Sequence, residues 1–276
     1  NNHITDSCPL QDTIEFLNAN NIQYCGAGLD FKDANRTVDF IEGNSKVKIV
    51  NFGWEVIQCD VVTKDKPGVN PLNKKNVLNT IKNLVENFPD NKIIPFMHWS
   101  YELEAEPQPF ERELAKAMID LGAAGVIGCH PHRIGGIEFH NNKPIIYSLG
   151  NWLFMQNFYH NKKLKFPAFC SSELAVEWDF DSESFKLHFF EFDSKNSTLH
   201  FDRSQEITPE VIDLLTPFSG LTNDEYKIWY KKNHFHKGKG LPIYYWDDSY
   251  LKQKMKNSIN KLRDNLLKIY IKYRKS

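Results

Sequence analysis

Three short segments of this chain combine side chains that could bind a metal ion. They are residues 1–3 (NNH), 98–102 (HWSYE) and 128–132 (GCHPH). Imidazole nitrogen and amide oxygen are ligands that suit Zn, Mn or Fe better than Ca. His130 and His132 are one residue apart, so on an extended backbone both rings would lie on the same side and could bind two adjacent ions. Taken alone, an H-x-H pair can also be a coincidence, and a single histidine such as His98 is more often an ordinary hydrogen-bonded residue.

Two of these segments follow predicted strands. Residues 93–97 form an apolar run that predicts a buried strand ending at His98, and residues 124–127 predict a strand just before segment 128–132. Apolar residues at helical spacing predict helices around residues 77–85 and 110–121. Strands that alternate with helices indicate a layered α/β fold, in which binding sites lie at the carboxyl ends of the strands.

Turn residues between alternating segments predict antiparallel pairing elsewhere. Residues 38–41 and 47–52 flank the turn EGNS, and residues 134–139 and 144–149 flank HNNK. Three more alternating segments follow at 174–180, 185–192 and 198–201. The sequence therefore predicts two hairpins and a second, separate sheet.

Composition excludes several classes of protein. Among 276 residues, 41% are hydrophobic and 25% are charged, which excludes disordered, collagen-like and coiled-coil chains. The net charge of −1 provides no overall basic field, so we expect no nucleic-acid partner. Five scattered cysteines without a C-x-x-C pair favour a reducing compartment. We expect a cytoplasmic or membrane-associated protein, with any signal or anchor before Asn1 not visible.

Several motifs resemble one family in their order and spacing. Residues 94–102 (IPFMHWSYE), 126–132 (VIGCHPH) and 143–151 (KPIIYSLGN) closely resemble the CapA family of capsule and poly-γ-glutamate synthesis proteins, and residues 1–6 (NNHITD) resemble its Asn-Asn-His block. That family is similar to calcineurin-like metallophosphoesterases. The resemblance implies an α/β (α+β) fold, a two-sheet sandwich flanked by helices. We expect a CapA-like domain at 1–205 that lacks its first motifs, and a helical C-terminal extension at 206–276.

The resemblance also implies roles for individual residues. Asn2 would be a metal ligand and His3 the catalytic histidine near the scissile group. His98 and His130 would bind one divalent ion (Mn, Fe or Zn), and His132 would bind a second. The superfamily's carboxylate motifs precede its Asn-His block, so here they would lie before Asn1. We therefore expect the site within these 276 residues to be incomplete and to bind metal poorly.

Some positions depart from the family or allow two interpretations. Cys129 stands where the family commonly has His, and Ser100 where it commonly has Gly. Glu102 matches an acidic position and could act as a general acid/base or orient an imidazole, but a solvated loop carboxylate is equally compatible. Asn151 matches a family block too, although Gly-Asn after a strand is also typical of a turn.

The resemblance implies a function in the synthesis, trimming or export of an anionic surface polymer, either capsule or poly-γ-glutamate. A dinuclear-metal-dependent hydrolase of the phosphoesterase type would act on such a polymer or on a phosphorylated substrate. The alternative is a non-catalytic component that retains the fold and binds polymer or a partner protein.

The final predicted helix has a distinct charge. Residues 251–276 include nine Lys or Arg and one acid, which gives this segment +8 and the remainder −9. Apolar residues recur at spacings of three and four and form one stripe: Leu251, Met255, Ile259, Leu262 and Leu266. We expect this stripe to pack on the domain. The outward lysines would either be solvated or contact an anionic polymer, anionic lipid headgroups or an assembly partner.

Overall fold

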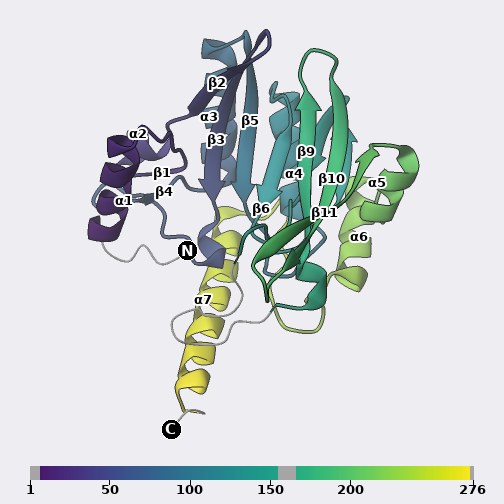
Figure 1. The fold of residues 1–276 in the computed structure, drawn as a ribbon. Coiled ribbons are helices and arrows are strands. Elements are labelled where there is room, and N and C mark those ends of the chain that lie inside the picture. Colours follow the sequence, from purple (N-terminus) through teal and green to yellow (C-terminus); the bar gives the residue numbers. More distant parts are fainter. Residues whose placement is uncertain (1–6, 155–165, 274–276) are drawn as a thin grey trace.

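A six-stranded mixed sheet is the centre of the molecule (Figure 1). The computed structural model describes residues 7–154 and 166–273. Within the sheet β3, β5, β6 and β8 are parallel, while β2 and β7 pair antiparallel at the two edges, so both predicted hairpins are confirmed. The strands in spatial order are β2 (Val38–Glu42), β3 (Ser45–Gly53), β5 (Asn91–His98), β6 (Val126–Cys129), β8 (Lys143–Ile146) and β7 (Ile137–His140).

A second sheet packs against one face of the first. Its antiparallel strands are β11 (Thr198–Glu206), β10 (Ser184–Asp193) and β9 (Ser172–Asp179). Buried apolar residues join the two sheets: Ile137 and Ile146 from the large sheet contact the cluster of Leu174, Leu187 and Phe189. The predicted two-sheet sandwich is therefore confirmed.

Helices cover the other face of the large sheet. The main core lies between that face and α3 (Lys74–Asn87) and α4 (Pro109–Asp120). The helix α4 begins with a capping box, in which the Glu111 carboxylate accepts a hydrogen bond from the Gln108 backbone N–H at 2.8 Å. Smaller elements near the N-terminus are α1 (Ser7–Ala19), β1 (Ala27–Gly28), α2 (Phe31–Ala34), η1 (Glu55–Ile57) and β4 (Gly68–Val69).

The residues beyond β11 share the main core. They form α5 (Pro209–Leu215), α6 (Asn223–Asn233) and α7 (Tyr250–Tyr273). The short helix η2 (Ala168–Cys170) lies earlier in the chain, just before the second sheet. Phe218, Tyr226 and Tyr244 belong to the same buried cluster as Phe52 and Trp99 of the large sheet and its rim. The boundary expected at residue 205 falls near the end of β11, and the helices after it pack directly on the body.

The docking face of α7 differs from the prediction. The five residues of the apolar stripe are 45–76% exposed, whereas Lys256 and Asn260 are buried. Lys256 Nζ donates to the Ile243 carbonyl at 2.6 Å and pairs with Asp248. The expectation that the stripe packs on the domain is wrong, because the body offers buried hydrogen-bond partners to the polar face instead. Among the helices described here, none is long and apolar enough to cross a bilayer.

Candidate metal and substrate site

Three of the predicted ligands lie together at the carboxyl edge of the large sheet. His98 ends β5, which is parallel to β6 and pairs with it so that His98 lies opposite Cys129. The ring centroids of His98 and His130 are 4.7 Å apart, and those of His130 and His132 are 5.5 Å apart. The carboxyl ends of adjacent parallel strands meet at one edge, and this brings residues 31 or more positions apart in sequence into one cluster.

The backbone at the H-x-H pair is not extended. β6 ends at Cys129, and φ is +98° at His130 and +58° at His132. The expected extended geometry is therefore wrong, although the two rings are still neighbours. Positive φ is unfavourable for residues other than glycine and clusters at functional sites. The turn is held in part by a hydrogen bond from the Leu103 N–H to the Pro131 carbonyl at 2.9 Å, which joins two loops of this edge.

Two imidazole nitrogens at this edge have no hydrogen-bond partner among residues 7–154 and 166–273. They are Nε2 of His98 and Nε2 of His130, and both atoms are buried. Burial lowers the pKa of His98 to about 4 and that of His130 well below its usual value, with the neighbouring histidines lowering it further. Both rings are therefore neutral at pH 7, the form that binds a metal.

The described residues offer only part of a metal site. Buried nitrogens without partners fit imidazole ligation of a divalent ion. Within residues 7–154 and 166–273, however, no group of three or more His, Cys, Asp or Glu side chains is arranged to hold one. Asn2 and His3, the other two predicted residues of the set, lie outside the described residues.

Asn151 contacts the His132 ring, and Glu173 in turn binds the backbone at Asn151. The Nδ1 atom of His132 lies 2.7 Å from Asn151 Oδ1. An amide oxygen only accepts hydrogen bonds, so Nδ1 of His132 is the donor in this contact. The Glu173 carboxylate in turn accepts from the backbone N–H groups of Asn151 and Trp152. Burial raises the pKa of Glu173 to about 7. Sequence reasoning missed Glu173, which comes from β9 of the second sheet.

Cys129 contacts the other ring nitrogen of His98. Its Sγ lies 3.3 Å from His98 Nδ1. Burial raises the pKa of this thiol to about 12, so it is a neutral thiol at pH 7 and a poor nucleophile. The residue that departs from the family pattern thus touches a predicted ligand.

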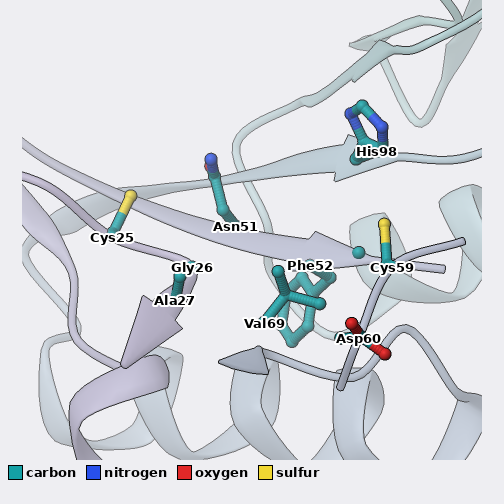
Figure 2. A pocket seen from close by; sticks show the side chains of 10 residues that line it. Cys25, Gly26, Ala27, Asn51, Phe52, Cys59, Asp60, Val69 and His98 are labelled. Atoms are coloured by element: carbon teal, nitrogen blue, oxygen red, sulfur yellow. The ribbon is translucent and has the colours of Figure 1, made fainter. Parts of the chain in front are cut away.

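A pocket of about 250 Å³ opens beside His98. In Figure 2 the side chains of Cys25, Asn51, Cys59 and His98 point in a similar direction, with Asn51 on β3, His98 at the end of β5 and the two cysteines in loops. Asn51 Oδ1 is buried and has no hydrogen-bond partner in the part of the chain that the structure describes, and Asp60 also lines the pocket. Because polar atoms converge here next to the histidines, this is the candidate substrate pocket. No motif in the sequence indicated Asn51.

The acidic residues of the 101–106 loop behave differently from one another. Glu102 is exposed, and its backbone carbonyl accepts a hydrogen bond from His236 at 2.6 Å. Among the described contacts, its carboxylate makes none with the three histidines. Glu104 is buried, accepts from the Phe235 N–H at 2.9 Å, and has a pKa raised to about 9 by burial and by Glu106. Glu104 is therefore protonated at neutral pH, which only its burial could reveal.

A two-sheet sandwich flanked by helices, with histidines at the carboxyl edge of the large sheet, is a metallophosphoesterase-like α+β fold. Residues 1–156, more than half of the chain, match the family model described as "Bacterial capsule synthesis protein PGA_cap". The chain belongs to this family, and the resemblance to CapA proteins is confirmed.

Two curated relatives illustrate the similarity. The "Capsule biosynthesis protein CapA" of Bacillus anthracis is 31% identical over 166 residues, which cover 59% of this chain and 40% of the relative. The "PGA biosynthesis protein CapA" of Bacillus subtilis is 31% identical over 160 residues, covering 56% of this chain and 41% of the relative. The matched regions thus span about two fifths of the length of these relatives.

Proposed function

We propose that this protein acts in the synthesis, trimming or export of an anionic surface polymer. In this proposal the histidine edge, formed by His98, His130 and His132 at the carboxyl edge of the large sheet, is a divalent-metal-dependent hydrolytic site. The names of its relatives, which refer to capsule and PGA biosynthesis, support a role with such a polymer. The observation that supports the site is the pair of buried, unpartnered Nε2 atoms of His98 and His130 beside a pocket. Buried polar atoms are normally satisfied, so two adjacent exceptions favour a missing ligand.

In this proposal His98 and His130 hold one ion, His132 contributes to the second, and Asn2 is a further metal ligand. A bound divalent ion would polarise a phosphoryl or acyl oxygen and lower the pKa of a water molecule. Asn151 keeps the His132 ring in one orientation through the 2.7 Å contact at Nδ1. His3 would assist the leaving group. Glu102 remains a candidate proton donor to a polymer bound across the exposed loop.

A non-catalytic binding role is the second candidate. Within the described part of the chain, no carboxylate joins the three histidines in a metal-binding group. Imidazoles alone leave the charge of two divalent ions unbalanced, which would suit weak metal binding without turnover. In that case the pocket beside His98 would bind a polymer end or a partner.

Metal binding and hydrolysis should be measured on the full chain. We would titrate Mn²⁺ and Zn²⁺ while following the thermal unfolding temperature, and then assay bis-p-nitrophenyl phosphate and the chain length of poly-γ-glutamate. Because the site is partial, we expect weak binding, so that metal raises the unfolding temperature of the wild type only at concentrations high enough to occupy a weak site. We expect no such rise in His98→Gln or His130→Gln, because each change removes a ligand.

His200→Gln is the matched control, since this histidine is exposed on β11 in the second sheet. An equal metal effect in wild type and both site variants would overturn the metal site. A metal effect that needs His98 and His130, together with no cleavage of either substrate at saturating metal, would favour the non-catalytic role instead.

A further inference from the structure

The helix α7 has its polar face docked and its apolar face in water. Buried or half-buried positions on it are polar, including Lys256, Asn257 and Asn260. The exposed positions include Leu251 at 76%, Leu262 at 61% and the other members of the stripe. In an ordinary surface helix this pattern is reversed. The stripe therefore adds nothing to the packing of the body that the structure describes.

Specific hydrogen bonds fix the rotation of α7 about its axis. Asn260 Nδ2 donates to the hydroxyl oxygens of Tyr101 at 2.9 Å and Tyr244 at 3.0 Å. The Tyr244 hydroxyl donates to Asn257 Oδ1 at 2.9 Å, and Asn257 Nδ2 donates to Glu55. With about 3.6 residues per turn, the centre of the stripe lies roughly 140° around the helix from this docked face. The body thus holds the stripe pointing outward.

Cations flank the stripe on both sides. Among the described residues of α7, Lys254 and Lys261 are exposed on one side of the stripe. On the other side Lys252 is exposed and pairs with Asp248 at 2.8 Å, and Arg263 is half-buried and pairs with Asp264 at 3.6 Å. The one acid, Asp264, faces the body near Gln58. The segment from residue 251 carries +8 while the remainder of the chain carries −9. An anionic surface would therefore attract α7 and repel the rest of the molecule.

We propose that α7 is a docking surface for an anionic lipid bilayer. The helix lies in the plane of the headgroups, with Leu251, Met255, Ile259, Leu262 and Leu266 in the acyl boundary and the flanking lysines at the phosphates. The stripe extends about 22 Å along the axis, since each residue of a helix rises by about 1.5 Å. This inference is independent of the hydrolytic site.

Other occupants fit the surface less well. A second copy of α7 would cover the stripe but would bring two strongly basic helices together. Poly-γ-glutamate would neutralise the lysines but leave the stripe in water. Only a surface with anionic groups above an apolar layer matches both features, as in basic amphipathic helices that lie on membranes.

Sedimentation with lipid vesicles tests the proposal on the full chain. We would compare vesicles of pure phosphatidylcholine with vesicles that also contain about 30% phosphatidylglycerol. Each would be tested at roughly 0.05 M and 0.3 M salt, because salt screens the attraction between lysines and anionic lipids. We expect at least about tenfold tighter binding to the anionic vesicles at low salt, and a steep loss at high salt. The double variants Leu262→Ser/Leu266→Ser and Lys254→Gln/Lys261→Gln should each lose most of this binding.

Two controls carry the same changes elsewhere. Leu214→Ser replaces an apolar residue that is 79% exposed on α5, and Lys195→Gln replaces an exposed cation in the β10–β11 turn; both should bind like wild type. No binding to anionic vesicles, or equal binding by the Leu262→Ser/Leu266→Ser variant, would overturn the proposal. Concentration-dependent self-association that this variant abolishes, or stripe-independent binding of poly-γ-glutamate without lipid binding, would assign the surface to those occupants instead.

Discussion

The histidine edge and the outer face of α7 are opposite kinds of exception to the rule that polar groups face water and apolar groups are buried. At the edge, Nε2 of His98 and of His130 are buried without partners. On α7, Leu262 and Leu266 are exposed at 61% and 57%. Neither arrangement favours folding, because the first buries polar nitrogens and the second exposes apolar side chains to water. Both exceptions fit the two proposals, in which a metal ion binds at the histidine edge and an anionic lipid surface binds α7.

A buried ion pair elsewhere in the body contrasts with both regions, because its polar groups are paired. Arg112 is 1% exposed and forms a bidentate ion pair with Glu138, which also accepts a hydrogen bond from the Tyr147 hydroxyl at 2.7 Å. The same guanidinium donates to the carbonyl of Leu221 at 2.8 Å, so it ties the C-terminal helices to the sheet. Changes at such buried ties should be costly, whereas changes in the two binding regions should be mild.

Arg112→Met should have the largest effect. It leaves the Glu138 carboxylate buried without its partner, and we expect the free energy of unfolding to fall by about 3–5 kcal/mol. Urea unfolding followed by circular dichroism at pH 7 measures this. Arg203→Met, at an exposed pair with Asp202, should cost at most about 1 kcal/mol. A small loss at Arg112 would mean that this buried pair does not hold the fold. Adding Glu138→Met should restore much of the loss.

Glu111 should make stability depend on pH. Burial raises its pKa from 4.5 to about 7, so between these values the folded state binds more protons than the unfolded state. Stability from this group is complete below about pH 4.5 and falls as pH rises towards 7, by up to about 3 kcal/mol. Glu111→Gln cannot titrate, so its stability relative to wild type should improve as pH rises over that window.

Unfolding free energies at several pH values from 4.5 to 7.5 test this. The exposed Glu42→Gln should give a curve parallel to that of wild type. Parallel curves for Glu111→Gln as well would show that the buried carboxylate titrates like an exposed one.

Asn260→Ala should cost about 1–3 kcal/mol, because it leaves the buried hydroxyls of Tyr101 and Tyr244 without their donor. Leu262→Ser, which lies two residues and roughly half a turn from Asn260 on the exposed side of the helix, should change stability by less than about 0.5 kcal/mol. Thermal or urea unfolding of both variants compares the two faces of α7 directly. If the leucine change costs more than the asparagine change, the stripe packs on the body and α7 is an ordinary surface helix.

His98→Leu should have the smallest effect on the metal-free protein, within about 1 kcal/mol of wild type at pH 7. Replacing a buried, unpartnered polar atom by an apolar group of similar size costs little and can stabilise. The same variant should lose the rise in unfolding temperature that metal produces. A large destabilisation without metal would mean that the imidazole is part of the core rather than a ligand.

The local pattern of apolar and turn residues was sufficient to predict most of the fold. Alternating residues around EGNS and HNNK predicted the two hairpins, and three further alternating segments predicted the second sheet. The gathering of His98, His130 and His132 also followed from sequence, because each lies after a parallel strand of one sheet. Strand ends and turns depend on residues close together in the chain, which is why they could be predicted.

Contacts between distant segments could not be predicted. Glu173 reaches the backbone of Asn151 and Trp152 from the other sheet, and Asn51 lines the pocket from β3. Burial of Glu104, which raises the pKa of its carboxyl, and exposure of Glu102 two residues earlier were also decided by the tertiary structure. No spacing in the chain encodes which segments will meet.

The helix α7 shows most clearly what local sequence determines and what tertiary contacts decide. Sequence by itself determined that residues 250–273 are helical and that five apolar residues share one side. The tertiary structure decided which side docks. Helical periodicity fixes which residues lie on a common face, but the partners of that face come from elsewhere in the chain. Here Tyr101, Tyr244 and Asp248 offered buried hydrogen bonds and an ion pair, so the polar side packed inward and the apolar side remained in water.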